Sequence, residues 1–404
     1  MLFNFGPRSS ILLIFFFHGV VFAYLLFKKS LQYKQVSSRW LGGFTLLCCL
    51  YICPWMLGHA GWYANQPYRN ILFYVPTQQV FLLGPFIYFY TQSLLNNSFR
   101  FRKRDWLHFV PGFLYLLYSL VVFLTDMVIL KEYYFYENQR DKDLATWYQL
   151  AGLGSMGIYF WVSLRVYNHY KKRTYQELSF ADQVQFKWVK RYLWAFMLML
   201  LFRVTFLLIY PNWGSFPKKW WYYLFFALLF YYITLSGYAN TIRSNIYFDA
   251  DEPEGLPQNE VKSEDLEALE KIVEPDAEIP KPSFENIDYQ YWKQKVLTLM
   301  EEDKLYKNQL LKITDIAEAL QTNARVISRL INQEFEMNFN DFVNHYRVQA
   351  VKEQIDQQAH ENYTLLGIAM ECGFNSKTTF NRAFKKFLDM SPRAYLNQEY
   401  KMSK

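Results

Sequence analysis

Long apolar stretches, separated by short polar segments, fill about the first 240 residues of the chain. A helix that crosses about 30 Å of hydrocarbon needs roughly 20 mostly apolar residues. The first stretch differs from a cleaved signal peptide, because Lys28 and Lys29 stand where a small-residue cleavage site would fall. On this template the pattern predicts seven membrane-spanning helices, at residues 10–27, 40–57, 71–94, 106–130, 144–168, 192–210 and 218–240.

The basic residues between these stretches predict an orientation. The segments after the first, third and fifth stretches hold fourteen Lys and Arg residues, whereas the N-terminus and the other three segments hold seven. Lys and Arg are enriched in cytoplasmic loops. We therefore expect residues 1–243 to form a multi-pass domain with its N-terminus outside and its C-terminal end in the cytoplasm.

Composition and charge divide the chain into unlike parts. Of 404 residues, 52% are hydrophobic and 20% aromatic, yet the mean hydropathy is only −0.10, which indicates one lipid-facing and one water-facing part. The net charge is +16 over residues 1–243, −10 over 244–280 and +1 over 281–404, which together account for the formal +7. The acidic, proline-rich stretch 244–283 is typical of a linker that cannot fold alone. These features exclude a single soluble domain and a disordered chain.

After the linker, residues 284–404 show helical periodicity without further long apolar stretches. Ile316, Ala317 and Leu320 repeat with helical spacing, and a short polar break at residues 321–323 separates them from a second apolar face. Two short helices joined by so tight a turn form a helix-turn-helix, whose second helix can enter the major groove of DNA.

The same pattern recurs further along the chain. Ile368 and Ala369 match Ile316 and Ala317 in position, and Gly373 occupies the turn before a second basic helix. Glycine suits this turn because the chain must reverse without a side chain in the way. The intervening run 342–355 predicts one long helix that fixes the separation of the two units.

Four motifs follow one another in this part of the chain: Tyr346-Arg347 with Ala350, Ile368–Ser376, Phe380–Phe387 and Ser391–Tyr395. Through these motifs, residues 287–401 resemble the DNA-binding domain of the AraC/XylS family of bacterial transcription regulators. One departure is that the glycine which the family usually places after each recognition helix is missing, because Glu336-Met337 and Leu388-Asp389 stand there. We therefore expect altered geometry in these two loops, with the fold retained.

The resemblance implies that both recognition helices enter successive major grooves on one face of DNA. Arginine can read guanine through two hydrogen bonds, whereas Lys385 and Lys386 are expected to contact phosphate. The alternative for each basic residue is a solvated surface charge. The expected DNA-facing residues are Asn323, Arg325, Ser328, Arg329 and Asn332 in the first unit, and Asn375, Ser376, Lys377, Thr378, Asn381, Arg382, Lys385 and Lys386 in the second.

Polar residues inside apolar stretches predict a sensory site, because such residues are costly in a membrane and often functional. Arg203, with Gln78, Gln79, Asp126 and His59, is expected to line a polar pocket in the outer half of the membrane domain. Arg203 would there favour an anionic small-molecule ligand or pair with Asp126. The alternative is a structural arginine satisfied by backbone carbonyls or by reaching the interface.

These observations predict an all-α protein: a seven-helix membrane bundle, a linker, and two helix-turn-helix units joined by a long helix. We expect a one-component regulator in a bacterial inner membrane that binds double-stranded DNA, as a homodimer, in response to a signal. A transporter or another membrane protein with an attached regulatory tail is the alternative. The sequence contains no recognised catalytic motif and no metal-ligand spacing among its histidines, so we expect neither an enzyme nor a cofactor.

Overall fold

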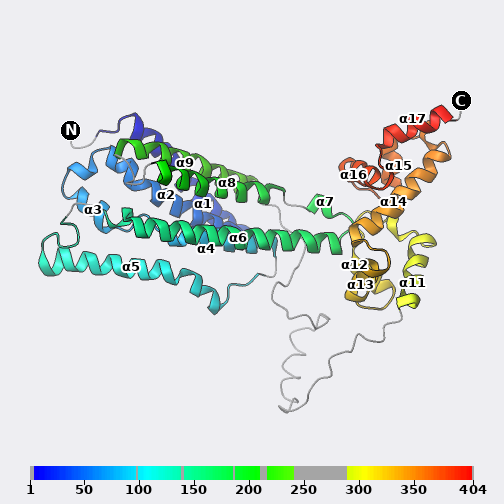
Figure 1. Ribbon diagram of the computed structural model, residues 1–404, viewed down its shortest axis with the longest axis horizontal. Coiled ribbons are helices and arrows are strands. Elements are labelled where there is room, and N and C mark those ends of the chain that lie inside the picture. Colours follow the sequence, from blue (N-terminus) through cyan, green and yellow to red (C-terminus); the bar gives the residue numbers. More distant parts are fainter. Residues whose placement is uncertain are drawn as a thin grey trace, which may run out of the picture. The chain divides into compact units, whose positions relative to one another are not determined.

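The computed structural model describes residues 4–96, 99–137, 141–184, 187–209, 216–240 and 289–402. Within these ranges the fold is all-α, as predicted. The chain forms two compact units (Figure 1). The first comprises Met1–Tyr170 and Phe186–Ala250, and the second comprises Lys171–Gln185 and Asp251–Lys404. The predicted linker, 244–283, lies outside the described residues.

Long helices build the first unit, with shorter 3-10 and π segments at their ends. The helix α5 (Val110–Phe123) is extended on one side by a 3-10 turn, η2 (Lys103–Phe109), and on the other by a π-helical segment, η3 (Leu124–Leu130). Two short 3-10 turns, η1 (Trp62–Ala64) and η4 (Lys142–Leu144), lie in connections. The other helices are α1 (Pro7–Tyr33), α2 (Val36–His59), α3 (Tyr68–Tyr74), α4 (Val80–Leu95), α6 (Thr146–Glu177), α8 (Lys187–Ile209) and α9 (Phe216–Ala239).

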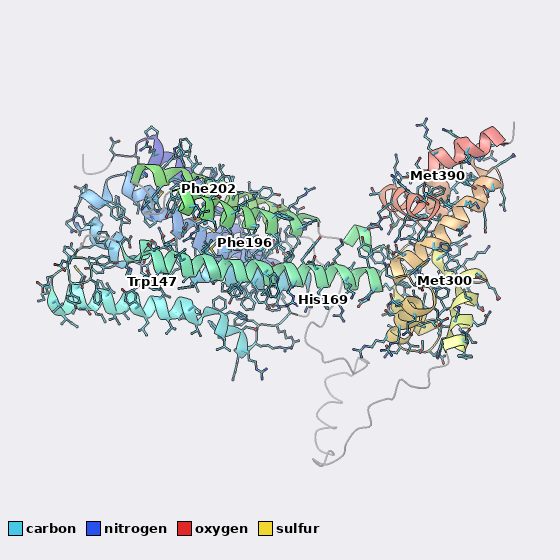
Figure 2. All side chains as sticks on the ribbon, viewed as in Figure 1. Trp147, His169, Phe196, Phe202, Met300 and Met390 are labelled. Carbon is cyan, nitrogen blue, oxygen red and sulfur yellow. The ribbon has the colours of Figure 1, made fainter. Side chains whose placement is uncertain are left out.

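Aromatic rings fill the core of this unit. The rings of Trp55 and Tyr223 stack with 4.4 Å between their centroids. On α8, Phe196 is fully buried, and the ring centroid of Phe202 lies 4.1 Å from that of Phe225 (Figure 2). Large rings bury much apolar area while losing few rotatable bonds, which explains how an aromatic-rich sequence can pack several helices together.

The outward faces of this unit are also apolar. Phe17 and Ile14 on α1, and Leu117 and Leu114 on α5, are each more than half exposed. A water-soluble protein rarely leaves a continuous apolar surface of this kind uncovered. Such faces are compatible with insertion into a membrane.

Four helices in the described residues are long and apolar enough to cross a membrane: Pro7–Tyr33, Val36–His59, Lys103–Leu130 and Lys219–Ala239. The prediction of seven was wrong in its count. The stretch 71–94 is broken between Tyr74 and Val80, which leaves a helix of only 16 residues, short of the roughly 20 needed. Helices α6 and α8 occupy the fifth and sixth predicted stretches but are not among these four. The orientation, which relied on seven crossings, remains a prediction.

The second unit contains the repeated helical pattern. Its C-terminal part comprises α11 (Tyr289–Glu301), η6 (Leu305–Lys307), α12 (Ile313–Ala319), α13 (Ala324–Glu334), α14 (Phe339–Asp356), η7 (Ala359–Glu361), α15 (Leu365–Glu371), α16 (Lys377–Leu388) and α17 (Pro392–Met402).

Helix α14 is shared between two hydrophobic cores. Its N-terminal half contributes Phe342 and Val343 to a core formed with α11, α12 and α13. Its C-terminal half contributes Val351 and Ile355 to a second core formed with α15, α16 and α17. The expected long helix between the two units is therefore present, and it links them by packing into both.

A segment from the connection between α6 and α8 also belongs to the second unit. The backbone N–H of Ser179 donates to the carbonyl of Leu311 (3.1 Å), and Leu178 forms an antiparallel bridge with Lys312. The buried amide of Asn340 donates to the carbonyls of both Leu178 (3.2 Å) and Ser179 (2.7 Å). These bonds hold the segment against α14 and the start of α12, and the short helix α7 (Ala181–Val184) follows it.

Candidate DNA-binding surface and a buried polar network

The first helix-turn-helix consists of α12 and α13. Helix α12 ends at Ala319, and Gln321 reverses the chain with a positive φ of 53°. Asn323 then begins α13 as its N-cap, because its side-chain oxygen accepts from the backbone N–H of Arg325 (2.8 Å). The short polar turn expected at 321–323 is present.

The second helix-turn-helix consists of α15 and α16, and it repeats this geometry. Thr364 caps α15 by accepting from the N–H of Gly367 (3.0 Å), and Ser376 caps α16 by accepting from the N–H of Thr379 (3.1 Å). Gly373 takes a φ of +95°, and a Cβ placed there would overlap the carbonyl oxygen of Tyr306. The expected requirement for glycine at this turn therefore has two causes, the backbone angle and the lack of space.

Arg347 fastens the connecting helix to the turn before α12. Its fully buried guanidinium donates to the carbonyls of Tyr306 (2.8 Å) and Asn308 (2.7 Å), to the side chain of Asn344 (3.3 Å) and to Ser179 Oγ (3.1 Å). Burial lowers the pKa of Arg347 to about 9, so the group is still charged at neutral pH. A buried charge is tolerated when oxygen acceptors surround it in this way. Arg347, which contributed to the family resemblance, is thus a structural residue.

The loops after the recognition helices contain residues with positive φ angles where the expected glycines are missing. Glu336 follows α13 with a φ of 53°, and Asp389 follows α16 with a φ of 55°. Both residues therefore take the left-handed conformation for which glycine is favoured at helix ends. Because neither residue is glycine, each carries a local backbone strain.

The residues expected to face DNA differ in their local hydrogen bonds and in the exposure of their side chains. Some have their polar atoms engaged locally: Asn323 and Ser376 are caps, Asn332 donates to the carbonyl of Ser328 (2.7 Å), and Asn375 donates to that of Gln309 (3.3 Å). Ser328, Ser376 and Asn375 are half-buried. The exposed side chains are Asn323, Arg325, Arg329 and Asn332 from the first unit and Lys377, Thr378, Asn381, Arg382, Lys385 and Lys386 from the second.

Two basic residues of α16 pair with aspartates. Lys386 Nζ lies 2.6 Å from the carboxylate of Asp341 on α14. Arg382 forms an ion pair with Asp182 and also donates to the hydroxyl of Tyr175 (3.2 Å). Tyr175 lies near the end of α6, and Asp182 lies in α7, between α6 and α8. Sequence reasoning missed this contact, because some 200 residues separate the partners and no local pattern marks them.

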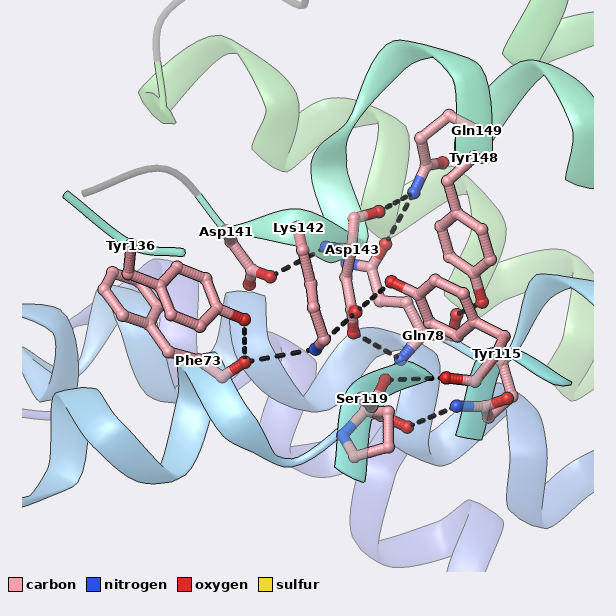
Figure 3. A network of polar contacts seen from close by, with 12 residues as sticks. Phe73, Gln78, Tyr115, Ser119, Tyr136, Asp141, Lys142, Asp143, Tyr148 and Gln149 are labelled. Atoms are coloured by element: carbon pink, nitrogen blue, oxygen red, sulfur yellow. Dashed lines mark hydrogen bonds and ion pairs between the residues drawn. The ribbon is translucent and has the colours of Figure 1, made fainter. Parts of the chain in front are cut away.

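In the first unit, buried polar side chains form a connected network (Figure 3). Arg203 donates to the side chain of Gln149 on α6, and Gln149 donates in turn to the side chain of Gln78 (3.1 Å). The backbone N–H of Gln78 donates to the carboxylate of Asp143 (3.4 Å), which also accepts from Tyr115 (2.6 Å).

Lys142 supplies a cation to the same network. Its ammonium lies 3.1 Å from the carboxylate of Asp143 and donates to the carbonyl of Phe73 (3.2 Å). Both residues of this ion pair are nearly buried, with side chains 9% and 2% exposed. Lys142 and Asp143 were expected in an external connection, so sequence reasoning did not include them in the pocket. The signal that could have identified them is a pair of opposite charges directly before the predicted apolar stretch 144–168.

The structure brings together two of the five residues predicted for the sensory pocket. Arg203 and Gln78 meet through Gln149. Gln79 instead donates to the carbonyl of Pro76 (2.8 Å), and the carboxylate of Asp126 accepts from the hydroxyl of Tyr74 (3.0 Å), in a separate cluster. His59 is half-buried at the end of α2. The alternative of an Arg203–Asp126 pair is replaced by the contact with Gln149.

Residues 316–398 match the family described as Helix-turn-helix domain, which is of AraC type. The match extends from α12 into α17 and so covers both units. The match supports a DNA-binding transcription regulator, and the matched family is not a family of enzymes. No curated protein and no solved structure matches the chain.

Proposed function

We propose that this protein is a membrane-anchored transcription regulator that binds specific DNA sequences and senses a signal through its membrane domain. The observation that carries the proposal is the joining, in one chain, of a double helix-turn-helix to long helices with apolar outward faces. In this proposal the apolar helices lie in a bacterial inner membrane, and the DNA-binding unit lies on its cytoplasmic side. Lipid covers the apolar outward faces, and the phosphates of DNA attract the basic helices.

The recognition helices α13 and α16 read DNA in this proposal. The exposed arginines Arg325, Arg329 and Arg382 contact base edges, and the exposed lysines Lys385 and Lys386 contact phosphates. The net charge of residues 281–404 is only +1, so binding depends on these local faces and on salt concentration. Two chains in the plane of a membrane have a raised effective concentration, which favours binding to DNA as a homodimer.

The buried network around Arg203 is the proposed sensory element. An arginine, a lysine and an aspartate in an apolar unit carry a large electrostatic cost unless they are fully paired. A small anionic ligand that competes with Gln149 for Arg203 would rearrange α6 relative to α8. Arg203→Leu should abolish the response to the signal while membrane insertion persists. A variant that inserts and still responds would end this part of the proposal.

Membrane extraction and DNA selection test the two halves of the proposed function separately. Full-length protein should stay in the membrane pellet after an alkaline carbonate wash, as an integral protein does. The same protein, purified in lipid nanodiscs, should enrich one sequence motif from a pool of random duplex DNA. Release by carbonate would refute the anchored regulator, and a pool that stays random would refute sequence-specific binding.

A further inference from the structure

The contact of Arg382 with Asp182 lies on the recognition helix that the proposed function sends into DNA. Arg382 Nη1 donates both to the Asp182 carboxylate and to the Tyr175 hydroxyl, and its guanidinium carbon lies 5.9 Å from the centre of the Tyr175 ring. Tyr175 also donates to Asp182 (3.0 Å), so the three side chains form a closed triad. We propose that residues 174–182 are an autoinhibitory clamp that occupies the DNA-reading arginine of α16; this inference rests on the proposed function.

The carboxylate of Asp182 substitutes chemically for an acceptor on DNA. Arginine reads guanine by directing two parallel N–H groups at two acceptor atoms, and it binds phosphate oxygens in the same way. In the triad an N–H donor of Arg382 already points at carboxylate and phenol oxygens. DNA must therefore displace Asp182 before α16 can read a base through Arg382, and the clamp lowers the observed affinity by the cost of that displacement.

Burial makes the displacement unfavourable for the acid. The side chain of Asp182 is 9% exposed, whereas that of Arg382 is 45% exposed. When the arginine turns toward DNA, a nearly buried carboxylate loses its cation. The clamp therefore stays in place until residues 174–182 leave their position against α14 and α12.

The position of residues 174–182 against α14 and α12 does not depend on the ion pair between Asp182 and Arg382. Leu178 and Ser179 are buried, and they are held by the backbone bridge to Lys312, by the amide of Asn340 and by Arg347. A change confined to Asp182 should consequently leave the segment docked. This separation makes the clamp testable without unfolding the unit.

Helix α6 joins the clamp covalently to the buried network. It runs without a break from Thr146 to Glu177, with Gln149 near its start and Tyr175 near its end. A ligand that changes the contact between Gln149 and Arg203 would act on the same helix that carries part of the clamp. Two states of α6, one clamped and one released, are sufficient for the signal to shift DNA binding.

The test compares full-length variants in nanodiscs, using duplexes selected in parallel from random DNA by wild type and by Asp182→Asn. Asp182→Asn keeps the shape of the side chain but removes its charge. It should bind the selected duplexes about fivefold tighter than wild type, the factor expected for losing one partly exposed ion pair. Tyr175→Phe should shift binding in the same direction by a smaller factor. Glu177→Gln is the matched control, because it changes an acid on the same segment that pairs with Arg173 instead.

The outcomes separate the clamp from the proposed function. Tighter binding by Asp182→Asn, together with unchanged binding by Glu177→Gln, supports the clamp. Equal or weaker binding by both Asp182→Asn and Tyr175→Phe overturns it while DNA binding stands. If neither wild type nor Asp182→Asn selects any duplex, the proposed function fails and the clamp falls with it.

Discussion

The two helix-turn-helix units have the same backbone plan but differ in what surrounds them. Gln321 and Gly373 occupy the same place in the two turns, and both have positive φ angles. The first turn leaves room for a side chain, whereas the second lies against the carbonyl of Tyr306. On the recognition helix α16, Arg382 is paired with an aspartate from a distant segment of the chain. Arg325 and Arg329 of α13 are exposed, as Arg382 is. A repeated sequence pattern therefore sets the backbone, and distant parts of the chain set the electrostatic surroundings.

The largest expected effect comes from Arg347, which fastens α14, the helix shared by both cores, to the turn before α12. Arg347→Met should destabilise the second unit by about 3 kcal/mol, because the buried carbonyls of Tyr306 and Asn308 lose their donor. Hydrogen exchange of the α12 and α15 amides in the full-length protein measures this loss of stability as faster exchange in both helix-turn-helix units. Arg325→Met, on an exposed position, is the control and should change stability by less than about 0.5 kcal/mol. Loss of protection in one unit alone would contradict the shared role of α14.

Gly373→Ala should separate the two turns. We expect a loss of about 2 kcal/mol in the second core, from the backbone angle and from overlap with Tyr306. The corresponding change in the first turn, Gln321→Ala, should be nearly neutral because a Cβ is already present. Hydrogen exchange of α15 and α16 reports the loss. Equal effects in the two turns would show that packing at Gly373 does not differ from that at Gln321.

Substitution of the two arginines sharpens the difference in DNA binding. Arg329→Ala should weaken binding to the selected motif and relax its specificity by about 1–3 kcal/mol, as expected for the loss of one base contact. Arg382→Ala should relax specificity too, but lose less affinity, because it also removes the clamp. Binding isotherms on matched and mismatched duplexes measure both quantities. Unchanged affinity in both variants would refute the assignment of these arginines to DNA.

The smallest effect is expected at the helix ends. Glu336→Gly should stabilise the first core by about 1 kcal/mol, since glycine accepts a positive φ without steric strain. Asp389→Gly should stabilise the second core by only a few tenths of that, because aspartate tolerates this conformation better than glutamate. Destabilisation by Glu336→Gly would show that the observed angle carries no strain.

The DNA-binding unit could be predicted from local sequence to a large extent. Its apolar residues repeat at helical spacing, and short polar turns with caps such as Ser376 mark where each helix begins. These signals lie within a few residues of one another, so tertiary context does not override them. The positive φ angles of Glu336 and Asp389 could not be predicted, because the absence of glycine does not reveal whether another residue adopts the same angle.

The first compact unit was less predictable from sequence. An apolar stretch predicts a helix but not its continuity, and the break after Tyr74 removed one predicted span. The contact of Arg203 with Gln149 was missed because the two residues lie 54 positions apart in the sequence, on different helices. For the same reason no local pattern pointed to the contact between Asp182 and Arg382.

The central claim is that this chain binds discrete DNA sites while anchored in a membrane. Genome-wide mapping of DNA cross-linked to the full-length, C-terminally tagged protein recovered from membranes tests it most directly. The account predicts discrete sites that share one motif, with stronger enrichment at the same sites for Asp182→Asn. Absence of enriched sites for both proteins, recovered from membranes in equal amounts, would contradict it.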